Sequence, residues 1–168
     1  MQWLKILKLV KLQHALFALP LTLIAVIVAS EGRPDWLKFF WVLVAFLSAR
    51  SLGMGLNRLL DSGIDAKNPR TSHRLMASGE LGKKEVLPWL LGFGVFFFVA
   101  CLNLHPMALK LSPVCLFLLT IYPLMKRFSI FCHLILGMVL ALGPIGAWVA
   151  IAGEFHPGVL ALGAGIMF

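Results

Sequence analysis

Three side chains with oxygen donors recur at a fixed interval in the middle of the sequence. Asn57, Asp61 and Asp65 are spaced i, i+4 and i+8, and in a helix this spacing places all three on one face, each about one turn from the last. Two carboxylates one turn apart repel each other unless a positive charge lies between them. Mg²⁺ binds a few carboxylates and takes its remaining oxygen ligands from water and phosphate. The spacing therefore predicts a Mg²⁺ site that bridges the protein to a phosphorylated substrate.

The alternative is an ordinary amphipathic helix end whose acidic side chains face water. Two neighbouring features favour the metal site. Arg50 lies seven residues before Asn57 and shares its face, and ionisable groups within an apolar span usually serve a function. Gly53 and Gly55 are small residues of the kind that allow membrane helices to approach closely. We therefore expect the three oxygen donors to ligate the metal and Arg50 to contact the substrate.

A polar loop with two arginines follows the oxygen donors. Arg70 and Arg74 are four residues apart, and they line up if the chain turns helical after Pro69, a residue suited to a first helical position. Guanidinium groups bind phosphate through paired hydrogen bonds, so both arginines are predicted to bind the phosphate groups of the substrate. The alternative is anchoring on one side of the membrane, for which Lys and Arg serve equally. His73 is expected to be a surface residue.

A second basic turn follows the fourth apolar stretch. Tyr122 and Lys126 are spaced i, i+4 and share a helix face, although Pro123 can kink that helix. Lys126 and Arg127 could hold a diphosphate or stabilise it as a leaving group, but two basic residues in a short turn also satisfy simple topology. Lys11, at the start of the first apolar stretch, faces either the cavity or the lipid headgroups and is included in the predicted substrate site.

The elements that must position these residues are membrane helices. The chain has 168 residues, of which 60% are hydrophobic and 13% are charged, and an apolar excess of this size cannot be hidden in one water-soluble core. About 20 consecutive apolar residues span a bilayer. The fold class is therefore predicted to be an all-α, polytopic transmembrane helix bundle. Its expected parts are spans near 13–30, 36–57, 86–104, 108–125 and 130–152, a partial sixth span from 158, and a polar loop over 61–85.

Basic residues mark one side of the predicted bundle. The other side carries Arg33, Lys38 and Lys110, whereas the basic side carries Lys5, Lys8, Lys11, Arg58, Lys67, Arg70, Arg74, Lys83, Lys84, Lys126 and Arg127. An excess of Lys and Arg is typical of cytoplasmic loops. The amino terminus, the 61–85 loop and the turn at Lys126 are therefore predicted to be cytoplasmic. The formal net charge of +8 lies in short clusters between apolar runs, a pattern that favours membrane topology over nucleic-acid binding.

Four motifs spread over nearly the whole chain form a combined pattern. They are Lys11-x2-His14-x2-Phe17-x2-Pro20, Asn57-x3-Asp61-x3-Asp65, Asn68-Pro69-Arg70-Thr71 with Arg74, and Tyr122-Pro123-x2-Lys126-Arg127-Phe128. Together they resemble the UbiA superfamily of intramembrane prenyltransferases, in particular its 4-hydroxybenzoate polyprenyltransferase-like bacterial branch.

This resemblance implies a bundle of nine transmembrane helices around a central cavity, with Mg²⁺ held by two aspartate-rich motifs. It implies transfer of a prenyl chain from a polyprenyl diphosphate to an aromatic acceptor such as 4-hydroxybenzoate, in ubiquinone or menaquinone biosynthesis at a bacterial inner membrane. The triad Asn57, Asp61 and Asp65 would be the first metal cluster. Tyr122 would contact the diphosphate together with the two basic residues of its turn and ease its departure.

Two features depart from the family pattern. The second aspartate-rich motif is absent, and the partial span from 158 reaches only about half the hydrocarbon thickness, so residues 1–168 are expected to form the amino-terminal part of one longer prenyltransferase domain. The loop also reads His73-Arg74-Leu75-Met76, where relatives often have Pro or Glu after the Arg.

Other interpretations stay open at this point. The chain could be an inactive fragment, or a transporter or scaffold segment in which Asp61 and Asp65 form a cation pathway. A CDP-alcohol phosphotransferase is disfavoured because no acidic residue precedes Asp61 in the second span. The sequence names neither the aromatic acceptor nor the length of the prenyl chain.

Overall fold

The structure is a computed structural model that describes residues 2–125 and 132–167, apart from the side chains at positions 12–14, 16 and 17. All the regular secondary structure within those residues is helical, which confirms the predicted all-α class. The helices are α1 (Gln2–Val10), α2 (Leu12–Ala29), α3 (Trp36–Lys67), α4 (Lys83–Leu102), α5 (Pro106–Met125), α6 (Cys132–Ala152) and α7 (Pro157–Met167).

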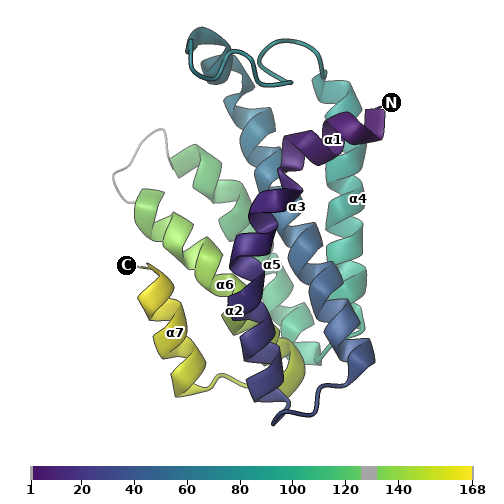
Figure 1. Ribbon diagram of the computed structural model, residues 1–168, viewed down its shortest axis with the longest axis vertical. Coiled ribbons are helices and arrows are strands. Elements are labelled where there is room, and N and C mark those ends of the chain that lie inside the picture. The colour runs from purple at the N-terminus through teal and green to yellow at the C-terminus, as the bar shows by residue number, and fades with distance from the viewer. Residues whose placement is uncertain (1, 126–131, 168) are drawn as a thin grey trace.

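Four of these helices are long and apolar enough to cross a membrane by length and composition, namely α3, α4, α5 and α6. The segment Ala18–Ala29 of α2, and α7, are shorter apolar helices. Each predicted span therefore coincides with a helix, and the chain is a multi-pass membrane protein. Consecutive long helices run in opposite directions (Figure 1).

Helix α3 is longer than the predicted span and extends through Lys67. The loop between α3 and α4 therefore covers residues 68–82, whereas the predicted loop covered 61–85. The carboxylate of Asp35 caps the start of α3 and accepts hydrogen bonds from the Leu37 and Lys38 N–H groups at 2.9 and 3.4 Å. The helix ends at Asn68, which has φ −102° and ψ 119°, because a residue that precedes a proline avoids the α conformation.

A short amphipathic helix closes one end of the bundle. Helix α1 lies across that end, beside the 68–82 loop (Figure 1). A buried cluster joins α1 to α3, α4 and the loop, and consists of Ile6, Leu9, Leu52, Leu81, Val86 and Leu90. Lys5 donates a hydrogen bond to the backbone carbonyl of Glu80 at 3.1 Å. These contacts hold the loop against the bundle end that carries the predicted site.

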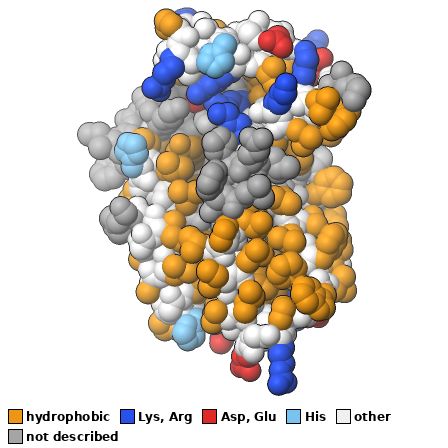
Figure 2. Space-filling view, viewed as in Figure 1, with side chains coloured by type: hydrophobic (Ala, Val, Ile, Leu, Met, Phe, Trp, Pro, Cys, Tyr) orange, Lys and Arg blue, Asp and Glu red, His pale blue; other side chains and the backbone are white. Residues whose placement is uncertain are grey.

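Charged and apolar side chains separate along the molecule (Figure 2). Lys and Arg gather at the end that holds the 68–82 loop, and hydrophobic side chains cover much of the visible flank. Within the bundle, a Cβ added at Gly53 would lie 2.8 Å from Cδ2 of Leu119 on α5, and one at Gly55 would overlap Leu90 on α4. The prediction that these glycines permit close helix approach is confirmed.

Candidate metal and diphosphate site

The last turns of α3 carry two carboxylates that are almost removed from solvent. Asp61 is 4% exposed and Asp65 is 8% exposed. Isolated buried carboxylates are costly, so such groups are normally paired with a positive charge or a metal. The predicted stripe therefore faces packed protein at the bundle end instead of open solvent, and this argues against a helix end whose acids simply face water.

An arginine from the loop occupies both oxygens of one carboxylate. Nη1 of Arg74 lies 2.7 Å from Oδ1 and 2.7 Å from Oδ2 of Asp65. Nη1 of Arg58, on α3 itself, lies 3.9 Å from Asp65 Oδ2, and electrostatic attraction also links Arg58 to Asp61. Two carboxylates and two guanidinium groups thus form one compact cluster, which we call the acid–arginine cluster.

The loop conformation that delivers Arg74 is a series of turns, not a helix. The Asn68 side-chain oxygen accepts a hydrogen bond from the Arg70 N–H at 3.0 Å, which is the local turn that Asn favours. The Thr71 hydroxyl donates to the backbone carbonyl of Asp65 at 3.0 Å. Arg70 and Arg74 were expected to line up if the chain formed a helix after Pro69, and the loop forms no such helix. Arg70 is exposed, whereas Arg74 is partly buried in the cluster.

Asn57 provides a direct test of whether a metal fits this site. Its Oδ1 atom is buried and has no hydrogen-bond partner among the described residues. A buried acceptor without a partner costs free energy, and a hard cation would satisfy it. No group of three or more His, Cys, Asp or Glu side chains in the described part of the chain could hold a metal. Two carboxylates and one amide oxygen, a donor set that suits Mg²⁺, are the candidate ligands in that part of the chain.

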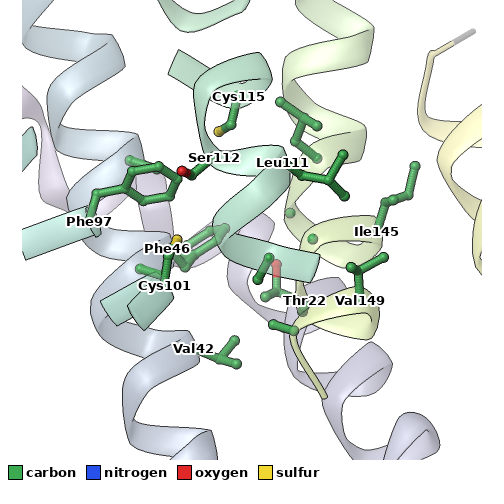
Figure 3. Close-up of a pocket in the computed structure, with 18 of the residues that line it drawn as sticks. Thr22, Val42, Phe46, Phe97, Cys101, Leu111, Ser112, Cys115, Ile145 and Val149 are labelled. Atoms are coloured by element: carbon green, nitrogen blue, oxygen red, sulfur yellow. The ribbon is translucent and has the colours of Figure 1, made fainter. Parts of the chain in front are cut away.

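A further predicted residue, Arg50, lies deeper in the bundle. Arg50 lines an apolar cavity of about 330 Å³ between α2, α3, α4, α5 and α6, and Figure 3 shows its walls, which include Thr22, Phe46, Phe97 and Ser112. The Nε atom of Arg50 is buried and lacks a hydrogen-bond partner within the described residues. An electrostatic interaction links Arg50 to Tyr122 of α5. Arg50 therefore lies at the cavity wall, close enough to Tyr122 to interact with it electrostatically.

Of the remaining predicted residues, the described Lys11 is not brought into the cluster. Lys11 joins α1 to α2 with φ 44° and ψ 56°, and its side chain is exposed. Lys126 and Arg127 lie outside the described residues, as does the side chain of His14. The roles assigned to these residues stay predictions.

Sequence reasoning missed Arg58 and Thr71. Arg58 precedes Asp61 by three residues and Asp65 by seven, so helical spacing alone could have placed it on the acidic face. From the sequence, Arg58 was assigned only to the basic side of the predicted bundle. Thr71 acts through its hydroxyl on the last turn of α3, and no spacing rule predicts that contact, because it depends on how the loop turns back.

The fold and the site define a multi-pass membrane protein with a buried acid–arginine cluster at one bundle end and an apolar cavity lined by Arg50. Comparison with known proteins then identifies it more closely. The chain belongs to the UbiA prenyltransferase family, whose family model matches residues 18–168.

A curated relative shows which members of the family the chain resembles. It is 35% identical over 134 residues to a 4-hydroxybenzoate octaprenyltransferase of Vibrio campbellii, a match that covers 79% of this chain and 47% of the relative. The chain thus spans about half the length of the curated relatives that it matches.

Solved structures show the same fold. The apo structure of a UbiA homolog from Aeropyrum pernix has a TM-score of 0.81 at 28% identity, over 93% of this chain and 59% of that one. A UbiA homolog from Archaeoglobus fulgidus, bound to DMAPP and Mg²⁺, has a TM-score of 0.79 at 15% identity, over 97% of this chain and 59% of that one.

Proposed function

We propose that this chain belongs to an enzyme that transfers a polyprenyl group from a polyprenyl diphosphate to an aromatic acceptor such as 4-hydroxybenzoate, with Mg²⁺ as cofactor. The pathway would be ubiquinone or menaquinone biosynthesis. The observation that carries the proposal is the stripe of Asn57, Asp61 and Asp65 at one bundle end. Both carboxylates are buried, and the buried amide oxygen of Asn57 has no hydrogen-bond partner among the described residues. Family membership and the curated relatives support the reaction class.

In this proposal the three oxygen donors of α3 would hold the metal. When bound, Mg²⁺ supplies positive charge that neutralises the diphosphate. The chain supplies further positive charge at the same bundle end, where Arg70 is exposed on the loop and Arg74 borders the cluster. A guanidinium fork suits phosphate oxygens. Both arginines would therefore contact the diphosphate, as would Lys11 at the same end.

The diphosphate leaving group would then lie at the polar bundle end, and the prenyl chain would lie in the apolar cavity. The C–O bond to the diphosphate would break, and an allylic cation would develop as diphosphate leaves. The electron-rich ring would attack the cation to form the new C–C bond, and the substituted ring carbon would lose its proton to the diphosphate or to water. Arg50, which interacts electrostatically with Tyr122, lines an apolar cavity that would take the prenyl chain and exclude water from the cation. Lys126 and Arg127 would stabilise the departing diphosphate.

The distribution of charge supports an orientation. The end with the 68–82 loop is rich in Lys and Arg (Figure 2), and such an excess is typical of the cytoplasmic side. We propose that the amino terminus and the site face the cytoplasm, at a bacterial inner membrane, where polyprenyl diphosphates could reach the cavity from the bilayer.

Binding tests the proposal without requiring turnover, which matters because the chain spans half the length of its relatives. The purified chain is titrated with a non-hydrolysable polyprenyl diphosphate analogue, with and without Mg²⁺. We expect Mg²⁺-dependent binding that is lost in Asp61→Asn. Glu154→Gln removes an exposed carboxylate outside the cluster and should bind like the wild type. Binding that ignores both Mg²⁺ and Asp61→Asn would overturn the proposal, and metal-independent cation transport would favour a transporter.

A further inference from the structure

We propose that Arg74 is the resident counter-cation of Asp65, and that a divalent metal must displace its guanidinium from that carboxylate to bind fully. The inference rests on the proposed function, because it concerns the same metal site. It assigns to the 68–82 loop a state without metal, in which Arg74 caps Asp65, and a state with metal, in which Arg74 is released.

The contact that carries the inference is direct. One nitrogen of Arg74 is 2.7 Å from both oxygens of Asp65, so the guanidinium sits where a bidentate cation would sit. The Asp65 side chain is 11% exposed, which leaves little room for a second cation at the same position. A metal that approaches along the stripe from Asn57 and Asp61 would therefore compete with Arg74 for Asp65.

The positive charge of a bound divalent metal would repel the guanidinium group of Arg74. Asp61 and Asp65 provide two negative charges, and Arg58 and Arg74 provide two positive charges, so the formal charges of these four side chains cancel. Arg58 and Arg74 already repel each other. A divalent cation adds two further positive charges within a few ångströms, where Coulomb repulsion between partly buried groups is strong. One guanidinium must then move away.

The structure indicates which arginine moves. Arg58 lies on α3, and its side chain is 11% exposed, whereas the Arg74 side chain is 32% exposed and lies on the loop. The backbone on either side of Arg74 is held, by the Thr71 hydroxyl on the Asp65 carbonyl and by Leu75 packed against the buried cluster. The movement is therefore mainly a swing of the Arg74 side chain, which then becomes available to a phosphate oxygen.

Metal affinity without any substrate provides the first test. Mn²⁺ is titrated into the purified chain and followed by electron paramagnetic resonance. We expect Arg74→Gln to bind Mn²⁺ about tenfold more tightly than the wild type, the equivalent of about 1.4 kcal/mol, because no competing cation remains. Arg74→Lys keeps the charge and should stay near the wild type. Lys67→Gln removes an exposed charge at the same helix end and should change affinity less than twofold.

Chemical modification reads the movement of the Arg74 side chain itself. Phenylglyoxal modifies accessible guanidinium groups, so Mn²⁺ should increase modification of Arg74 relative to modification of the exposed Arg70 in the same loop. Equal Mn²⁺ affinity in wild type and Arg74→Gln, or weaker affinity in the folded variant, would overturn the inference while leaving the metal site standing. No Mn²⁺ binding to any variant would overturn the proposed metal site as well. Helicity by circular dichroism confirms that each variant is folded.

Discussion

Replacing Gly137 by Ala should force α7 to shift slightly away from α6. A Cβ at this position would lie 2.7 Å from both the Cα and the carbonyl oxygen of Met167, and these are backbone atoms that cannot rotate away. Carbon atoms pack best at about 3.5–4.0 Å, so α7 must shift by about 1 Å. Overpacking of this kind costs about 1–3 kcal/mol, against a gain of up to about 1 kcal/mol in helix propensity. The net expectation is a loss of roughly 0–2 kcal/mol.

A matched glycine on the same helix separates packing from propensity. A Cβ at Gly146 meets nothing within 4 Å, so Gly146→Ala should only gain propensity, about 0.5–1 kcal/mol. The two alanine variants should therefore differ by about 1–3 kcal/mol in the free energy of unfolding. The assay is reversible unfolding by SDS in mixed micelles, followed by far-ultraviolet circular dichroism. If Gly137→Ala and Gly146→Ala agree within about 0.5 kcal/mol, the close α6–α7 contact does not govern stability.

Three further changes test other parts of the molecule. Asp35→Ala removes the acceptor that caps α3 and should lower the free energy of unfolding by about 1 kcal/mol in the same SDS assay; an unchanged value would show that the cap is not used. Arg50→Met removes a buried Nε atom that has no hydrogen-bond partner among the described residues, so the free energy of unfolding should change by less than about 1 kcal/mol. The affinity for the polyprenyl diphosphate analogue should fall; an affinity equal to that of the wild type would remove Arg50 from the substrate site. Ala45→Phe places a ring in the cavity and should weaken the binding of long-chain analogues in a filtration assay, while the Mn²⁺ affinity stays unchanged. If the variant loses both analogue binding and Mn²⁺ binding, it is misfolded.

The helices that cross the bundle could be predicted because their apolar length is a direct consequence of the bilayer. Helix α1 was not predicted. It has nine residues, too few to be stable alone in water, and it forms because Ile6, Leu9 and Val10 are buried against the bundle. Their i, i+3, i+4 spacing was a local sign of such a face, but the surface that receives it exists only in the folded protein.

The acidic stripe could be predicted, but its partners could not. Helical spacing places Asn57, Asp61 and Asp65 together whatever surrounds them. The pairing of Asp65 with Arg74 instead depends on the turns of residues 68–82, which are set by tertiary contacts. The pair Leu75-Met76, which departs from the family pattern, is partly buried against the core cluster. That burial fixes the loop and so directs Arg74 toward α3.

The length of α3 relates the stripe to the bilayer. The helix has 32 residues, about 48 Å, whereas the hydrocarbon core is about 30 Å thick. Trp36 at its start is 73% exposed, as expected of an interfacial aromatic residue. If the hydrocarbon begins there, Arg50 lies about 21 Å along the helix and Asp61 about 38 Å. The carboxylates would then lie beyond the hydrocarbon core, while Arg50 would lie within it. A single helix would therefore place the proposed diphosphate site outside the hydrocarbon and the proposed prenyl-chain site inside it.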